Sequence, residues 1–235
     1  MQSAAKRQDR APLSVSAIEA SVEAMIIAGE LEPGAHVNES SIAAQLGVGR
    51  ASVREACRLL ERAGLVHIRP NQGTFVRALD IAEVVHLFDI RASLGRLAGR
   101  SAAAAIDAKQ LAALHALLAK LDEAAASGDA DAYITLNLAF HTALYEATGN
   151  ARLAALDQAI GKELRIYRRH GLAHGGGLRV SNREHRSIVE ALEQGDCERA
   201  GNELERHIAG GRDRFLRAMS ATGRLALQDG ADRPA

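Results

Sequence analysis

The chain has 235 residues, a hydrophobic content of 47%, and equal numbers of basic and acidic side chains, 29 of each. This length and composition can supply two domains with separate apolar cores. A formal net charge of zero argues against a protein that coats polyanions or membrane surfaces through bulk charge. Because the sequence has neither a signal peptide nor an apolar run long enough to span a bilayer, we expect a cytoplasmic protein without a membrane partner.

The N-terminal region begins with a polar segment and continues into an amphipathic helix. Residues 1–12 are expected to form a flexible tail. Beyond them, apolar residues recur at helical spacing from Ile18 to Ile26. Ser16 and Glu19 have the spacing of a capping box, and we predict that they begin this helix.

A glycine turn at Gly47 separates two further predicted helices. Ile42 and Leu46 lie four residues apart in the first, and Gly47 supplies the left-handed residue that ends it. In the second helix Arg50 and Arg54 form a stripe beside the apolar face. The pattern is that of a helix-turn-helix whose second helix presents arginines to a partner.

A predicted hairpin follows the arginine helix. Residues 65–69 and 74–77 have the composition of strands, and the segment 70–73 between them that of a turn. Three helices and a hairpin make up the winged helix-turn-helix layout. In that layout the last helix enters the major groove, and the wing reaches the flanking backbone or the minor groove.

The remaining sequence is helical from Asp80 onward. Helices are expected near 80–104, 107–127, 129–148, 150–171, 178–194 and 196–219. We therefore predict a mainly α fold: an N-terminal winged helix-turn-helix of three helices plus a β-hairpin wing, followed by an all-α bundle of six to seven helices. The domain boundaries are placed at 13–77 and 78–220, with a flexible C-terminal tail at 221–235.

Four side chains of the helical region could form a metal site. Asn137 and His141 lie four residues apart on one predicted helix, and His185 and His207 lie on two others. Helices of a bundle can direct such side chains into a common core. Imidazole nitrogens with one oxygen ligand suit a divalent metal ion such as Zn²⁺, Ni²⁺ or Mn²⁺ and leave positions open for water or a ligand carboxylate.

The N-terminal motifs resemble the DNA-binding domain of the GntR family of bacterial transcription regulators. The match includes Leu31-Glu32-Pro33-Gly34, Leu46-Gly47-Val48, Val53-Arg54-Glu55-Ala56 and Gly64-Leu65-Val66. The resemblance implies that Arg50 and Arg54 contact operator bases and phosphates and that Gly73 at the wing tip approaches the minor groove. It also places four residues at the DNA surface: Ser40, Gly49, Ala51 and Ser52. Gly49 and Ala51 replace the usual Ser or Thr, so we expect base readout to rest on the arginines.

The C-terminal motifs resemble the FCD effector domain of the FadR subgroup. They are Phe140-His141 with Gly149-Asn150, Glu184-His185 with Gly195-Asp196, and His207-Ile208. The resemblance implies metal ligands at Asn137, His141, His185 and His207, with Asn137 replacing the usual Asp. It implies that Arg91 holds the carboxylate of a small organic acid; Arg165, Arg168 and Arg169 are alternative anion contacts. Gly95 stands where the family normally has Glu.

The sequence thus predicts a homodimeric transcription regulator, a repressor by the family's usual mode, that binds a palindromic operator in double-stranded DNA. Its operator affinity would respond to a small organic acid bound near the divalent metal ion. No catalytic residues are expected. One alternative is a metal-dependent hydrolase or lyase with Glu184 as general base. Another is a regulator in which the metal only stabilises the bundle.

Overall fold

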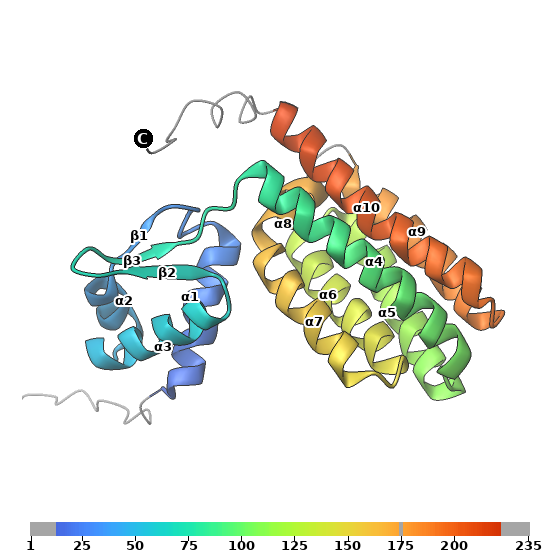
Figure 1. The fold of residues 1–235 in the computed structure, drawn as a ribbon, viewed down its shortest axis with the longest axis horizontal. Coiled ribbons are helices and arrows are strands. Elements are labelled where there is room, and N and C mark those ends of the chain that lie inside the picture. Colours follow the sequence, from blue (N-terminus) through green and yellow to red (C-terminus); the bar gives the residue numbers. More distant parts are fainter. Residues whose placement is uncertain (1–12, 174–175, 222–235) are drawn as a thin grey trace, which may run out of the picture. The chain divides into compact units, whose positions relative to one another are not determined.

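A computed structural model of the chain describes residues 13–173 and 176–221. The chain divides into two compact units, Met1–Ala78 and Leu79–Ala235, each considered by itself below (Figure 1). No helix of the described residues is long and apolar enough to cross a membrane. The two predicted tails lie outside the described residues, apart from Ala221, which is the last residue of a helix.

The described part of the first unit contains three helices and a small antiparallel sheet. The elements are α1 (Val15–Ala28), β1 (His36–Val37), α2 (Glu39–Leu46), α3 (Arg50–Arg62), β2 (Val66–Arg69) and β3 (Gly73–Val76). The strand order is β1-β3-β2, and β2 and β3 form the hairpin. The predicted winged helix-turn-helix is confirmed. β1 escaped prediction because a strand of two residues, pairing His36 with Phe75, carries no alternating pattern.

The start of α1 differs from the prediction. Its N-cap is Ser14, whose side-chain oxygen accepts a hydrogen bond from the backbone N–H of Ala17 at 3.1 Å. The predicted capping box of Ser16 and Glu19 is therefore wrong, because Ser16 already lies inside the first turn. Two serines offered a cap, and the chain uses the earlier one.

The turn between α2 and α3 sets the direction of the arginine helix. Gly47 ends α2 with φ of 66°, and its N–H bonds to carbonyls of the last turn of α2. In α3, Val53, Ala56 and Leu60 are fully buried. These core contacts fix the rotation of α3, so that Arg54 on its opposite side is exposed.

Seven helices form the described part of the second unit, which confirms the all-α prediction. They are α4 (Ile81–Ala105), α5 (Ala108–Ser127), α6 (Ala130–Ala147), α7 (Ala151–Glu163), α8 (Arg165–Ala173), α9 (Gly177–Glu193) and α10 (Cys197–Ala221). The single helix expected over 150–171 is wrong, because the chain bends at Leu164 and forms α7 and α8. No glycine or proline marks the bend. It places the side chains of Leu164 and Ile166 in the core.

Helices α4 and α10 lie side by side at close approach (Figure 1). A Cβ atom at Gly99 would overlap the backbone of Ala200, and one at Gly95 would overlap the side chain of Ile208. No glutamate could fit at Gly95 in this packing. The departure of Gly95 from the family pattern therefore accompanies a tight helix–helix contact.

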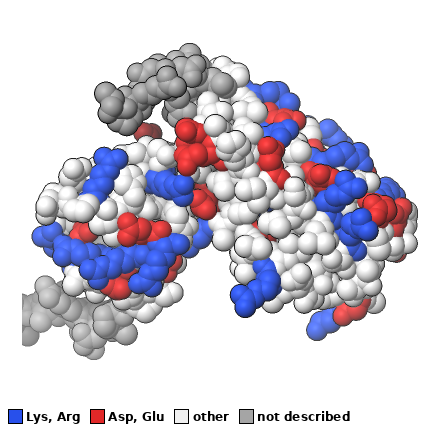
Figure 2. All heavy atoms as spheres, in the orientation of Figure 1, with Lys and Arg blue, Asp and Glu red and all other residues white. Residues whose placement is uncertain are grey.

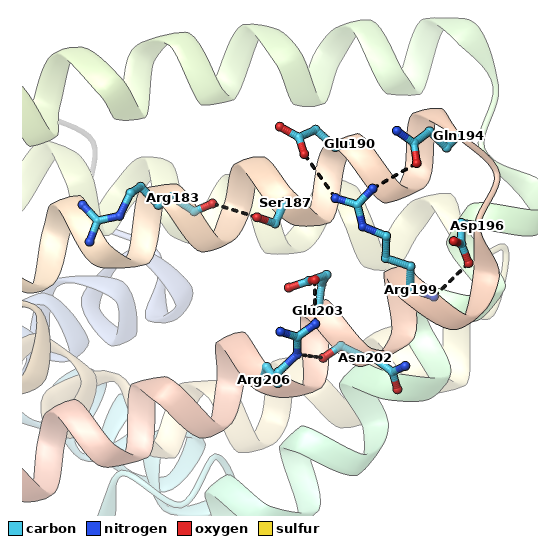
Figure 3. A network of polar contacts seen from close by, with 9 residues as sticks. All are labelled: Arg183, Ser187, Glu190, Gln194, Asp196, Arg199, Asn202, Glu203 and Arg206. Carbon is cyan, nitrogen blue, oxygen red and sulfur yellow. Dashed lines mark hydrogen bonds and ion pairs between the residues drawn. The ribbon is translucent and has the colours of Figure 1, made fainter.

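A polar network joins the end of α9 to the start of α10 (Figure 3). Arg199 donates one hydrogen bond to Gln194 Oε1 at 2.9 Å and forms an ion pair with Glu190 Oε2 at 3.2 Å. Glu190 lies in the last turn of α9, and Gln194 is its C-cap. This contact holds the helical hairpin that carries His185 on one helix and His207 on the other.

We expect Gly99→Ala to lower the free energy of unfolding by about 1–3 kcal/mol, because the added methyl group must displace the backbone of α10. Gly161→Ala is the matched control, since its Cβ would meet only Arg91 Nε at 3.9 Å. That variant should be neutral or gain up to about 1 kcal/mol from helix propensity. Urea denaturation followed by circular dichroism measures both. Equal midpoints for the two variants would contradict the packing argument.

Candidate nucleic-acid interface and metal centre

A hollow on the first unit lies between α3, the wing and the start of α2. Its lining includes four arginines together with one serine and the wing-tip glycine: Arg50, Arg54, Arg58, Arg69, Ser40 and Gly73. Figure 2 shows the basic side chains as a band across this unit with acidic side chains beside it. The surface is therefore locally basic even though the whole chain is neutral.

The structure brings four of the seven predicted DNA contacts into this hollow: Ser40, Arg50, Arg54 and Gly73. Gly49, the N-cap of α3, and Ala51 in its first turn are exposed, and Ser52 is half-buried; none of the three lines the hollow. With no side-chain hydrogen bond at the N-cap, the amide end of α3 has only backbone groups to offer an anion.

The arginines of α3 differ in their partners. Arg54 Nε lies 3.2 Å from Glu39 Oε2, and Arg58 Nη1 lies 2.9 Å from Glu55 Oε2. Glu39 could not be predicted as the partner of Arg54, because the two residues are 15 positions apart. Among the described residues no acidic side chain forms an ion pair with Arg50, so its charge is open to a phosphate.

Gly73 begins β3 in a conformation that favours glycine. Its φ is 103°, and an added Cβ atom would lie 2.6 Å from His36 Nε2. Both the backbone and the neighbouring imidazole therefore require glycine here. His36 is a groove-lining residue that sequence reasoning missed, since β1 itself was not predicted.

In the second unit three buried histidines converge from α6, α9 and α10. One ring nitrogen from each of His141, His185 and His207 lies within 4.8 Å of the other two. His141 Nε2 and His207 Nε2 are 3.2 Å apart. Two nitrogen ligands at ~2.1 Å from a tetrahedral metal ion lie ~3.4 Å apart, so this spacing is close to that of a metal site. Asn137 is buried one turn before His141.

Several buried polar atoms of this cluster have no partner within the described residues. They are Asn137 Oδ1, His141 Nδ1 and both ring nitrogens of His185, one of which carries a hydrogen in the neutral ring. An unpartnered buried polar atom costs about 1–3 kcal/mol, and such groups are uncommon in native cores. A divalent cation accepts electron pairs from these atom types. The residues present therefore fit a metal ion.

Burial, together with the positive charge of nearby arginines, lowers the pKa of all three imidazoles well below 6.5. At neutral pH each ring is therefore uncharged, which is the form that binds metal. His207 Nδ1 lies 2.8 Å from Glu184 Oε2, and Glu184 Oε1 accepts from Arg214 Nη1 at 2.7 Å. A proton on His207 Nδ1 directs the lone pair of Nε2 toward His141.

A narrow polar cavity adjoins the histidines. Its lining includes Arg91, Asn137, Arg168, His207 and Arg214. Arg91 lines this cavity, but one edge of its guanidinium is used by a carboxylate: Nε donates to Asp157 Oδ1 at 2.7 Å and Nη2 to Oδ2 at 3.2 Å. Both side chains are buried. The positive charge of Arg91 is therefore balanced within the protein.

Arg168 is the cavity arginine that has no carboxylate partner among the described residues. Burial and then the charge of Arg91 lower its pKa to about 9, so it stays cationic at neutral pH. Of its neighbours in the basic run, Arg169 pairs with Asp131 at the surface. Arg168 was one of three alternatives in the sequence, and only the structure separates it from them.

Comparison with known proteins agrees with this geometry. Residues 14–76 match the family described as bacterial regulatory proteins, gntR family, and residues 86–210 match the FCD domain. A probable D-xylose utilization operon transcriptional repressor of Paenarthrobacter nicotinovorans is 36% identical over 187 residues, which cover 78% of this chain and 80% of that protein.

Solved structures show the same fold. E. coli McbR/YncC superposes with a TM-score of 0.76 at 24% identity, over 86% of this chain and 97% of that one. A GntR transcriptional regulator from Rhodococcus sp. RHA1 gives a TM-score of 0.70 at 28% identity, over 87% and 98%. The chain therefore belongs to the GntR family of bacterial transcription regulators and carries an FCD domain as its second unit.

Proposed function

We propose that this regulator is a cytoplasmic homodimer that represses transcription and binds a palindromic operator through the hollow between α3 and the wing. The observation that supports DNA reading is the exposed, unpaired Arg50 in the same hollow as Arg54 and the Gly73 wing tip. Among the described residues of the first unit, few basic side chains lack an acidic partner. Two copies on one operator would therefore be needed for useful affinity. Repression is consistent with the name of the Paenarthrobacter relative.

The helical unit is proposed to bind a divalent metal ion, Zn²⁺, Ni²⁺ or Mn²⁺, through His141, His185, His207 and the Asn137 side-chain oxygen. The support is the set of buried, unpartnered nitrogen and oxygen atoms at this point. The metal would supply a fixed positive charge next to the cavity. Neutral ligands, including Asn137 in place of a carboxylate, leave that charge uncompensated, so the site favours an anionic effector.

The effector in this proposal is a small organic acid whose carboxylate binds Arg168. Arg91 contributes to the positive field of the cavity, while its Nε and Nη2 groups hold Asp157. The cavity is narrow, which favours acids of few atoms. A guanidinium can hold a carboxylate through two parallel hydrogen bonds.

A contact on α8 offers a route from effector to DNA. The Tyr167 hydroxyl accepts a hydrogen bond of 2.8 Å from the backbone N–H of Leu79, the first residue of the helical unit. Tyr167 is adjacent to Arg168 on the same helix. A ligand that moves α8 would therefore move the point at which the chain enters from the DNA-binding unit, which is a physical coupling of the two sites.

The alternative of a hydrolase or lyase has weaker support. Both Glu184 carboxylate oxygens are engaged, one by His207 and the other by Arg214, so Glu184 is not free to act as a general base. In our proposal Glu184 instead orients the metal-binding ring of His207 through its bond to Nδ1.

Arg50→Ala should weaken binding to the operator by about tenfold to a hundredfold, because each arginine contact to a base or phosphate contributes ~1–3 kcal/mol. Arg62→Ala is the matched control, since Arg62 is an exposed residue of the same helix outside the hollow. The operator is first selected from a random duplex pool with the wild type, and fluorescence anisotropy then measures affinity. Equal losses in both variants would contradict the assignment of the interface.

Glu184→Gln should reduce Zn²⁺ affinity by about 10- to 100-fold, because the neutral amide holds the His207 ring less firmly. Glu193→Gln is the control, as it makes the same change on the same helix at an exposed side chain. Competition with a chromophoric chelator gives the affinities. If wild type binds no Zn²⁺ above background, the metal proposal fails; if both variants bind like wild type, the role of Glu184 is wrong.

Small carboxylates such as acetate and succinate should raise the melting temperature of the Zn²⁺-loaded protein, and Arg168→Gln should lose most of that rise. The loss corresponds to about 10- to 100-fold in affinity for one charge-assisted hydrogen-bonded pair. Arg169→Gln, one residue along α8 and paired with Asp131, should respond like wild type. A wild type that melts earlier on chelation yet responds to no acid in a broad panel would support a purely structural metal.

A further inference from the structure

An acidic side chain lies in the hollow proposed to receive DNA. Glu39 is the first residue of α2 and lines the same concave surface as Arg50 and Arg54. Its side chain is only 15% exposed. A carboxylate near phosphates weakens DNA binding through repulsion, so its presence calls for a compensating role.

The contacts of Glu39 hold it firmly between two elements of the unit. Oε2 accepts a hydrogen bond from Arg54 Nε at 3.2 Å, and Oε1 accepts one from the Thr74 hydroxyl at 3.4 Å. Thr74 is a buried residue of β3 in the wing. Glu39 is also the first residue of α2, where the positive end of the helix dipole stabilises an acidic side chain. Glu39 thus ties the wing and α2 to one arginine of α3.

The pairing uses one edge of the Arg54 guanidinium and leaves the other end free. Glu39 engages Nε, while Nη1 and Nη2 have no hydrogen bond among the described residues. Two adjacent N–H donors of an arginine can bind O6 and N7 of guanine in the major groove. A side chain already held in one orientation loses less conformational entropy when it makes this contact.

We propose that Glu39 is a positioning residue for sequence readout: it orients Arg54 so that Nη1 and Nη2 read a guanine. The inference rests on the proposed DNA-binding function. The inference separates the discrimination between base pairs from the overall affinity for DNA, two quantities that usually change together. Removing the Glu39 charge should relax discrimination at one base pair, while the affinity for DNA of any sequence should stay the same or rise because a repulsive charge is gone.

Glu55 provides a matched control. It lies on α3 and pairs with Arg58 at 2.9 Å, but this is a local i,i+3 pair whose partners are 44% and 56% exposed. Glu55→Gln removes the same charge from the same unit without touching Arg54. Any general electrostatic effect should therefore be common to both variants, whereas a change in readout should be confined to Glu39→Gln.

The test begins with selection of an operator from a random duplex pool by the wild-type protein. Anisotropy titrations then compare that operator, a set of duplexes with each G·C pair changed singly to A·T, and an unrelated duplex. We expect Glu39→Gln to lose about fivefold or more of the discrimination at the position where Arg54→Gln also loses it. Its affinity for the unrelated duplex should equal or exceed that of wild type, and Glu55→Gln should keep full discrimination.

The outcomes are distinguishable. If wild type enriches no sequence, the DNA-reading function and this inference both fail. If it enriches an operator and Glu39→Gln discriminates at every position as wild type does, only the role of Glu39 is overturned. Thr74→Val removes the second hydrogen bond to Glu39 while keeping a β-branched side chain on β3, and should relax discrimination at the same position. It tests the inference independently should Glu39→Gln fail to fold.

Discussion

The burial of uncharged imidazoles is the constraint on which the helical unit depends. His141, His185 and His207 have been removed from water with half of their ring nitrogens unpartnered among the described residues, an arrangement that opposes folding by itself. Close packing of α4 on α10 through glycine contacts, and the hairpin of α9 and α10, hold the three rings together regardless. The preformed polar centre thus lowers the stability of the bundle, as is common for binding sites.

Among the described residues, the cavity beside the histidines has one arginine more than it has carboxylate partners. Arg91 has Asp157 as its partner, and Arg214 has Glu184, so two of the cavity's cations are neutralised. Arg168 has no carboxylate partner among the described residues. Because a partly buried cation without a counter-charge is costly, the cavity favours the anionic effector of our proposal over a neutral molecule.

Local patterns predicted the helix-turn-helix and the bundle, because helix periodicity and glycine turns are properties of adjacent residues. The parts that failed depend on distant contacts or near-equal choices. β1 exists only through its pairing with β3, Ser14 prevails over Ser16 as a cap, and the bend at Leu164 serves the core. In the site, residue types predicted the histidine cluster, whereas the Asp157 partner of Arg91, 66 residues away, left no local signal.

The position of α8 relates the two halves of the proposed switch. Tyr167 and Arg168 are consecutive on this helix, so their side chains leave it about 100° apart. Tyr167 packs edge-on against Phe215 and accepts a hydrogen bond from the backbone N–H of Leu79, whereas Arg168 lines the cavity. In the proposed switch, an anion that moves Arg168 together with the backbone of α8 would also shift the Tyr167 hydroxyl. Because a hydrogen bond tolerates little change in length or angle, such a movement of α8 would displace Leu79, the first residue of the helical unit.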